Sequence, residues 1–160
     1  MNVWGALAGG FVGTLVLTSM LRAAGELGLS RMDLPFLLGT AVTSDRVRAK
    51  ALGYLLHFVA GLAFALVYFG VFSAIGQSGF ALGALFGLLH GVFAGTALVN
   101  VLLPVLHPRM GTPLSGADSQ PLLEPPGFLM LNYGRRTPFV TLIAHVAYGA
   151  IVGGFVSLAS

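Results

Sequence analysis

Four long apolar runs, separated by two polar connections and one short turn, dominate the pattern of this 160-residue chain. The runs cover about residues 3–22, 51–75, 79–103 and 138–159. Each is long enough to cross the hydrocarbon core of a bilayer as a helix, which takes roughly 20 apolar residues. The pattern therefore predicts an all-α polytopic membrane protein, a four-transmembrane-helix bundle that forms one transmembrane domain over residues 1–160.

The beginning of the chain is apolar but does not have the features of a signal peptide. It has no basic leading segment and no small-residue cleavage site after its apolar run. A signal peptide normally has both features. We therefore expect the first run to be a retained helix.

Composition strengthens the membrane prediction and excludes several kinds of chemistry. Hydrophobic residues make up 56% of the chain and charged residues only 8%, whereas a soluble domain carries about 25% charged residues. A soluble fold of this length could not hide so much apolar surface. Cysteine is absent, which excludes disulfides, thiolate metal sites and cysteine nucleophiles. The basic character rests on only eight residues, so we interpret it as membrane topology and expect no nucleic-acid partner.

The charged residues are placed very unevenly. They lie in or beside the connections 23–50 and 104–137, and none lies at the N-terminus, in the turn 76–79 or at the C-terminus. Basic residues favour the cytoplasmic side of a membrane. We therefore expect both connections to be cytoplasmic and both termini to be extracytoplasmic.

Three arginines of the second connection are candidates for contact with lipid headgroups or with an acidic partner surface. They are Arg109 in "LHPRM" and Arg135 and Arg136 in "GRRTP". Their simplest role is to anchor the cytoplasmic side, and anionic headgroups also attract such residues.

Short motifs predict where the helices begin. "TSDR" at 43–46 offers side-chain oxygens that can cap the second span. In "TP" at 137–138, Thr137 is expected to cap the fourth span, with Pro138 at its first position. Six prolines lie in 104–137, so this connection cannot be one helix. We expect its apolar piece "GFLML" to dip into the membrane interface.

Glycines recur every four residues on one face of each span, and two histidines stand in the same rows. Small residues on a shared face let transmembrane helices approach closely. The predicted helix-packing residues are Gly9, Gly13, Gly61, Gly87, Gly91, Gly95, Gly149 and Gly153. His57 and His145 each precede a glycine by four residues. We therefore expect both imidazoles to face the bundle interior, level with each other, about 10 Å from the cytoplasmic interface at 1.5 Å per residue.

Two roles for this histidine pair are open. An enclosed imidazole needs a hydrogen-bond partner. That partner can be a backbone carbonyl, or one of the hydroxyls and the amide of Thr14, Thr18, Ser19, Thr96 and Asn100. Alternatively, His57 and His145 bind a b-type haem from both sides, because bundle cores often hold such sites. By the same residue count His90 lies too far from the pair to join it, so we expect no metal site.

The chain also contains two similar halves. "GALAGGFVGT" at 5–14 resembles "GALFGLLHGVFAGT" at 83–96, and "PFLLG" at 35–39 resembles "GFLML" at 127–131. In each half, arginines and then a His-x-x-x-Gly helix follow. This pattern predicts a duplicated two-helix hairpin in parallel repeat.

Three segments, "DLPFLLGTAV", "LHPRM" and "LEPPGFLMLNYGRRTP", resemble a group of uncharacterised small four-span bacterial integral membrane proteins. The resemblance extends over most of the chain. It implies a location in the bacterial inner membrane, and it brings no assigned activity, cofactor or catalytic residue.

The sequence favours a non-enzymatic function. No Asp, Glu, Lys or Arg lies in the middle of a span, whereas ion-coupled transporters and pumps usually keep such residues there. The leading hypothesis is an accessory or scaffold subunit, with the bilayer and either a protein partner or a second copy as its contacts and with no cofactor. The alternative is a haem b electron-transfer protein that uses His57 and His145. A facilitator for a neutral solute is a third possibility.

Overall fold

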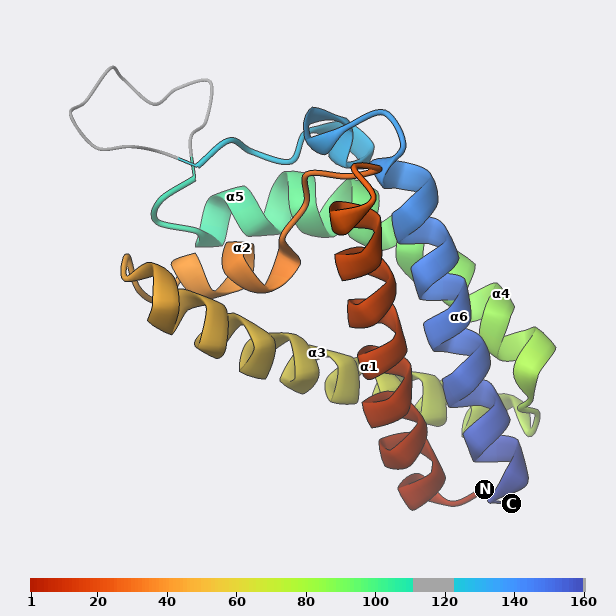
Figure 1. The fold of residues 1–160 in the computed structure, drawn as a ribbon. Coiled ribbons are helices and arrows are strands. Elements are labelled where there is room, and N and C mark those ends of the chain that lie inside the picture. The colour runs from red at the N-terminus through yellow and green to blue at the C-terminus, as the bar shows by residue number, and fades with distance from the viewer. Residues whose placement is uncertain (111–122, 160) are drawn as a thin grey trace.

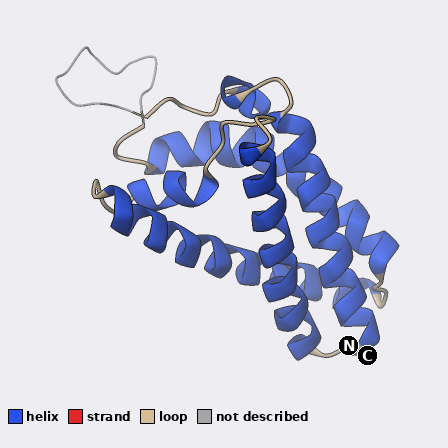
Figure 2. Cartoon of the chain, viewed as in Figure 1, coloured by secondary structure: helices blue, strands red, loops and turns tan. Residues whose placement is uncertain are grey.

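The computed structural model describes residues 1–110 and 123–159 (Figure 1). Within these residues the chain is helical and contains no strand (Figure 2). The segments are α1 (Val3–Glu26), α2 (Leu34–Thr40), α3 (Arg46–Ile75), α4 (Phe80–Phe93), the π-helix η1 (Ala94–Leu102), α5 (Leu103–Leu106), the 3₁₀-helix η2 (Phe128–Tyr133) and α6 (Thr137–Leu158).

Four stretches of helix are long and apolar enough to cross a membrane. They are α1, α3, the continuous stretch from α4 through η1 to α5, and α6. The predicted all-α bundle of four membrane-spanning helices is therefore confirmed. The two termini lie close together at one end (Figure 1). The segments that contain the Asp, Glu, Lys and Arg residues of the described chain lie toward the other end, which we call the charged end.

The helix α6 lies at the centre of the bundle, between α1 and α4, while α3 packs on α1 and α2. The helices α3 and α4 meet through large side chains. The rings of Phe72 and Phe86 are 5.4 Å apart and those of Tyr68 and Phe86 are 5.8 Å apart. Bulky rings thus lie between α3 and α4, whereas glycines lie at the contacts of α6 with α1 and α4 and of α3 with α1, so the four helices are unevenly spaced.

The α4–α6 contact is a backbone-to-backbone contact made by glycine. A Cβ atom at Gly83 would lie 2.1 Å from the carbonyl oxygen of Gly149, and one at Gly87 would lie 2.2 Å from that of His145. A Cβ atom at Gly153 would lie 2.4 Å from the carbonyl oxygen of Gly79. Only glycine allows this spacing, as expected for transmembrane helices that associate by close packing.

The other predicted packing glycines also lie at contacts between segments. A Cβ atom at Gly9 would meet Phe155, one at Gly13 would meet Tyr148, one at Gly61 would meet Thr14 and one at Gly95 would meet Leu129. A Cβ atom at Gly91 would lie 3.1 Å from the Cβ atom of His145. These rows therefore set the distances of α6 from α1 and α4, and of α3 from α1.

Two helices extend further into the charged end than the apolar runs predicted. The helix α1 continues to Glu26, where Arg22 and Glu26 form an i,i+4 ion pair at 3.0 Å. The helix α3 begins at Arg46, because the Asp45 carboxylate caps the backbone N–H of Arg48 at 2.8 Å. Hydropathy marks only the hydrocarbon-spanning part, so charged turns beyond it are missed.

The third span contains a π-helix that hydropathy did not indicate. From Ala94 to Leu102 the backbone has the wide i→i+5 pattern, and the Asn100 side chain donates to the carbonyl oxygen of Gly95 at 3.0 Å. The helix then continues through Pro104 to Leu106, although the span was predicted to end at 103. A proline ring in an α-helix clashes with the carbonyl four residues earlier, and the wider turns before Pro104 relieve that clash.

Each predicted connection contains a short helical segment. The helix α2 begins where Asp33 caps the backbone N–H of Phe36 at 3.1 Å. The segment η2 contains Leu129 and Met130 with positive φ angles of 52° and 60°. Met130 is buried, while Phe128 is exposed. The predicted "GFLML" element thus packs partly inward. The similarity of the two halves as a structural repeat is a separate question and stays a prediction.

Candidate functional site

The four histidines lie at three separate places. His145 of α6 and His90 of α4 are in contact, with ring centroids 4.8 Å apart. His57 of α3 borders a cavity beside α1. His107 lies after α5 at the charged end.

His145 belongs to a cluster of two imidazoles and two phenols. Its Nδ1–H donates to the carbonyl oxygen of Thr141 at 2.8 Å. Tyr68 and His90 share a hydrogen bond of 3.3 Å between the hydroxyl and Nδ1. The Tyr148 hydroxyl donates to the carbonyl oxygen of Gly61 at 2.5 Å and so joins α6 to α3. These polar groups hydrogen-bond within the chain, which gives the cluster a packing role.

The prediction that His90 lies too deep to reach the pair is wrong. It placed His90 by counting residues along straight parallel helices. The glycines Gly87 and Gly91 bring α4 directly against His145, so the two rings meet. Close helix contact, not depth along the sequence, decides which histidines are neighbours.

His145 uses a backbone carbonyl, one of the predicted kinds of partner, while the hydroxyls and the amide named as alternatives bond elsewhere. The hydroxyl of Thr14 donates to the carbonyl of Gly10 at 2.7 Å, and that of Thr18 donates to the carbonyl of Thr14 at 2.6 Å. Ser19, Thr96 and Asn100 likewise bond to carbonyls of their own helices. Hydroxyls on helices commonly bond to the preceding turn, and helical spacing alone does not reveal this competition.

One ring nitrogen of His57, Nδ1, lacks a hydrogen bond in the part of the chain that the structure describes. The residue is buried, with 7% of its surface exposed, and its Nδ1 is the one buried side-chain polar atom in the described residues without a partner. An unsatisfied polar group inside a bundle is costly. This side chain is therefore the strongest candidate for contact with something that is not part of the chain.

The space beside His57 is a cavity of about 520 Å³ between α1, residues 30–35 and α3. Its apolar walls include Leu21 of α1 and Met32 and Leu34 of the connection. The helices α1 and α3 cross near Thr14 and Gly61 and diverge toward the charged end (Figure 1). This divergence creates the cavity.

Charged residues line the mouth of the cavity, and most of them form ion pairs with one another. Arg22 pairs with Glu26 at 3.0 Å, and Lys50 pairs with Asp33 at 3.4 Å. The pairs are substantially exposed, so each contributes little to stability. Because each of these four charges has an opposite charge beside it, none of them is an unpaired charge at the cavity.

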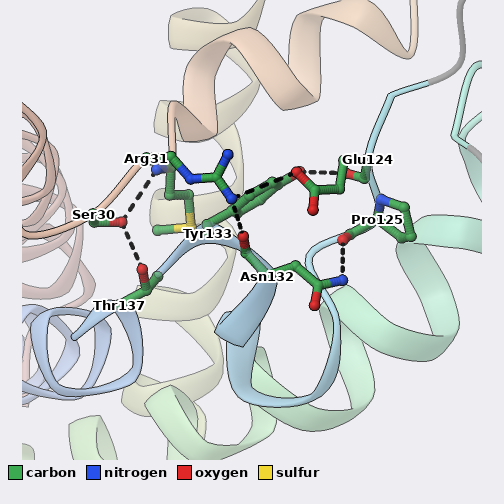
Figure 3. A network of polar contacts seen from close by, with 8 residues as sticks. Ser30, Arg31, Glu124, Pro125, Asn132, Tyr133 and Thr137 are labelled. Carbon is green, nitrogen blue, oxygen red and sulfur yellow. Dashed lines mark hydrogen bonds and ion pairs between the residues drawn. The ribbon is translucent and has the colours of Figure 1, made fainter. Parts of the chain in front are cut away.

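A network of polar contacts joins the two connections (Figure 3). The guanidinium of Arg31 donates to the carbonyl oxygen of Asn132 and forms an ion pair with Glu124 at 3.7 Å. The hydroxyls of Ser30 and Thr137 are 2.9 Å apart and buried. Thr137 is thus the first residue of α6 and bonds to Ser30, instead of capping the helix as predicted.

Tyr133 belongs to the same network and has a shifted pKa. Its hydroxyl donates to the backbone carbonyl of Glu124 at 2.7 Å. Burial, assisted by the charge of Glu124, raises the pKa of Tyr133 to about 12, although Arg31 acts in the opposite direction. The phenol therefore stays protonated, and can donate, over the whole physiological pH range.

His107 fixes α2 to the end of the third span, a role that sequence reasoning missed. Its Nδ1 accepts from the backbone N–H of Arg109 at 3.2 Å, so its Nε2–H donates to the carbonyl of Leu37 at 3.0 Å. The Arg109 guanidinium donates to the carbonyl of Thr40 at 2.7 Å. Nothing in "LHPRM" distinguishes these contacts from those of an ordinary polar loop.

The three arginines predicted to contact headgroups or a partner differ in their surroundings. Arg109 is half-buried and holds α2, so its guanidinium is already engaged. Arg135 and Arg136 are exposed at the start of α6. Only the latter pair is placed to meet a headgroup or an acidic surface.

The predicted haem pair gains no support from this geometry. A ring held by both His57 and His145 needs a space that touches both, and the 520 Å³ cavity borders only His57. Between α3 and α6, one turn away, the Tyr148 hydroxyl already reaches Gly61. Haem binding by this pair stays a prediction. In the described residues no group of three or more His, Cys, Asp or Glu side chains is placed to hold a metal ion.

Comparison with known proteins gives no relative. No protein family matches the chain, and no curated protein or solved structure is similar to it. The chain is a multi-pass membrane protein with four spans, and its function is inferred from its own residues.

Proposed function

We propose that this protein is a non-enzymatic accessory or scaffold subunit of the bacterial inner membrane, with both termini on the extracytoplasmic side. The absence of charged residues from the middle of the spans supports a non-catalytic role. So does the use of Tyr148 and His145 in hydrogen bonds to backbone carbonyls of the chain itself.

The main support for this proposal comes from the environment of Gly70 on α3, which differs from that of the other glycines in the spans. Every other glycine within the four spans has an atom of a neighbouring segment within 4 Å of a built Cβ atom, and Gly70 has none. Gly70 lies in the outer half of α3, and Ala63, seven residues earlier on the same face, is also exposed. Glycine weakens a helix by about 0.5–1 kcal/mol relative to alanine unless close packing uses it. The contact that uses Gly70 therefore belongs to a helix outside this chain.

We take the occupant of this face to be a transmembrane helix that packs against Gly70 as α4 packs against Gly149. Such a contact needs a small residue where the two backbones approach. The exposed Arg135 and Arg136 provide a second contact, with headgroups or an acidic part of the same partner.

Cysteine cross-linking in native membranes tests the proposal, because the chain has no cysteine of its own. We expect Gly70→Cys to give one adduct of defined mass with a short bifunctional reagent. A doubled mass would identify a second copy as the partner, and any other mass would identify a different subunit. Ala81→Cys, at an exposed position on α4, is the matched control.

Two results would overturn the proposal. One is that Gly70→Cys gives no more adduct than Ala81→Cys. The other is that Gly70→Leu, whose Cβ atom meets nothing within 4 Å among the described residues, leaves the adduct formed at a neighbouring Ala63→Cys unchanged. A leucine at the contact would separate the backbones and should abolish that adduct.

A further inference from the structure

Three properties make the cavity beside His57 suitable for a ligand. It is bounded by two spans and a connection but open on one side, its lining combines polar and apolar surface, and it borders the buried His57, whose Nδ1 has no hydrogen-bond partner among the described residues. Its volume of about 520 Å³ falls within the roughly 300–1,000 Å³ of small-molecule sites. It is also separate from the outer α3 face around Gly70.

We propose that this cavity binds the head of an uncharged amphiphile whose hydroxyl or carbonyl group hydrogen-bonds to His57. The imidazole supplies one donor or acceptor at the inner end of the site. The imidazole of a histidine can adopt a broad range of angles about its Cβ–Cγ bond. Either ring nitrogen can therefore turn to a head that enters the cavity.

The charged residues at the mouth of the cavity favour a ligand whose head group is uncharged. Two of the lining cations belong to the helices. Arg22 of α1 already pairs with Glu26, and Lys50 of α3 already pairs with Asp33. The third lining cation, Arg31, pairs with Glu124 outside this cavity and donates to a backbone carbonyl. An anionic head carried inward would have to break one of these pairs or remain without a counter-ion, and an unpaired buried charge is strongly unfavourable.

The apolar part of the lining favours a ligand that is amphiphilic. Leu21, Met32 and Leu34 add apolar surface to a lining that also carries polar and charged side chains. The cavity lies where α1 and α3 diverge, at the charged end of the spans (Figure 1). A lipid-like molecule in the adjoining leaflet can insert its head between the two helices and leave its chain in the bilayer.

Photolabelling of the full chain in nanodiscs tests the proposal, with a diazirine-bearing monoacylglycerol as the probe. We expect saturable labelling of peptides from α1 and α3 that line the cavity. Unlabelled monoacylglycerol should compete, and the corresponding fatty-acid anion and inorganic phosphate should compete at least tenfold less well.

Variants separate a bound head from non-specific lipid contact. His57→Phe keeps a ring and removes the hydrogen bond, so the apparent affinity should fall about 3–10-fold. His57→Gln restores a donor and an acceptor and should recover part of the loss. Leu21→Trp fills the cavity and should abolish saturable labelling, while Leu88→Trp, at a lipid-facing position, should leave it unchanged.

Three outcomes would overturn the proposal. Labelling that does not saturate would mean that only water reaches His57. Equal labelling of the wild type, His57→Phe and Leu21→Trp would place the probe elsewhere. Stronger competition by the fatty-acid anion would reverse the assigned charge of the head. If His57→Phe fails to fold, the comparison of Leu21→Trp with Leu88→Trp decides the question.

Discussion

The close contact between α4 and α6 makes a quantitative prediction for Gly149→Ala. A Cβ atom at this position would lie 2.2 Å from the carbonyl oxygen of Gly83 and 2.7 Å from the backbone nitrogen of Gly87. Ordinary van der Waals contact begins near 3.4 Å. Since both neighbours are backbone atoms, no side-chain rotation relieves the overlap, and the two helices must separate by about 1 Å, which weakens every dispersion contact along the interface.

The expected magnitude follows from two opposing effects. Overpacking of a tight contact costs about 1–3 kcal/mol. Alanine stabilises a helix by about 0.5–1 kcal/mol relative to glycine. We therefore expect the free energy of unfolding to fall by about 1–2 kcal/mol, which corresponds to a decrease in Tm of roughly 2–8 °C for a chain of this size.

Unfolding of the monomeric detergent-solubilised fraction, followed by far-UV circular dichroism during heating and SDS titration, measures this change. Gly70→Ala is the matched control, because a Cβ atom there meets nothing within 4 Å. We expect it to leave Tm unchanged or to raise it. The double variant Gly83→Ala with Gly149→Ala should lose less than the sum of the single changes, since one helix separation relieves both overlaps.

The reasoning would be refuted if Gly149→Ala were as stable as the wild type. It would also be refuted if Gly70→Ala were destabilised by the same amount. Either result would mean that the glycines do not set the distance between α4 and α6.

Three further changes test the polar contacts. His107→Ala removes the buried donor to Leu37, and we expect a loss of about 1–3 kcal/mol in unfolding free energy together with faster proteolysis near α2. Tyr148→Phe removes the donor to Gly61, so thermal unfolding should show a loss of about 1 kcal/mol, while a neutral effect would mean that the contact contributes nothing. Because the pKa of Tyr133 is raised to about 12, the folded state retains a proton that the unfolded state releases above about pH 10; alkaline titration should therefore destabilise the wild type between pH 10 and 12, and Tyr133→Phe should lose part of this pH dependence.

The membrane-spanning helices could be predicted because hydropathy responds directly to the bilayer. Length and apolar content alone identified the run at 51–75 and the other three apolar runs as membrane-spanning helices. The start of α3 was also visible, since Asp45 has the side chain and position of an N-cap. The same signal at Asp33, before Leu34 and Pro35, was not recognised, and α2 was therefore missed and assigned to a connection.

Contacts between helices could not be predicted in the same way. The glycine rows indicate which face is packed, but not which helix lies against it or at what angle. This is why His90 was placed away from His145, although Gly87 and Gly91 bring their rings together. The cavity beside His57 has the same origin, because it results from the divergence of α1 and α3.

The π-helix makes the width of the helical turns in the third span important. Each residue of an α-helix advances the chain by about 100° around the axis. Each residue of a wide turn advances the chain by a smaller angle, so converting the turns between Ala94 and Leu102 into α-helical ones, with no residue deleted, would rotate the following segment about the helix axis. His107 and Arg109 would then no longer face α2, although neither had been changed. The register of this span, as much as the residues in it, therefore links the interior of the bundle to its charged end.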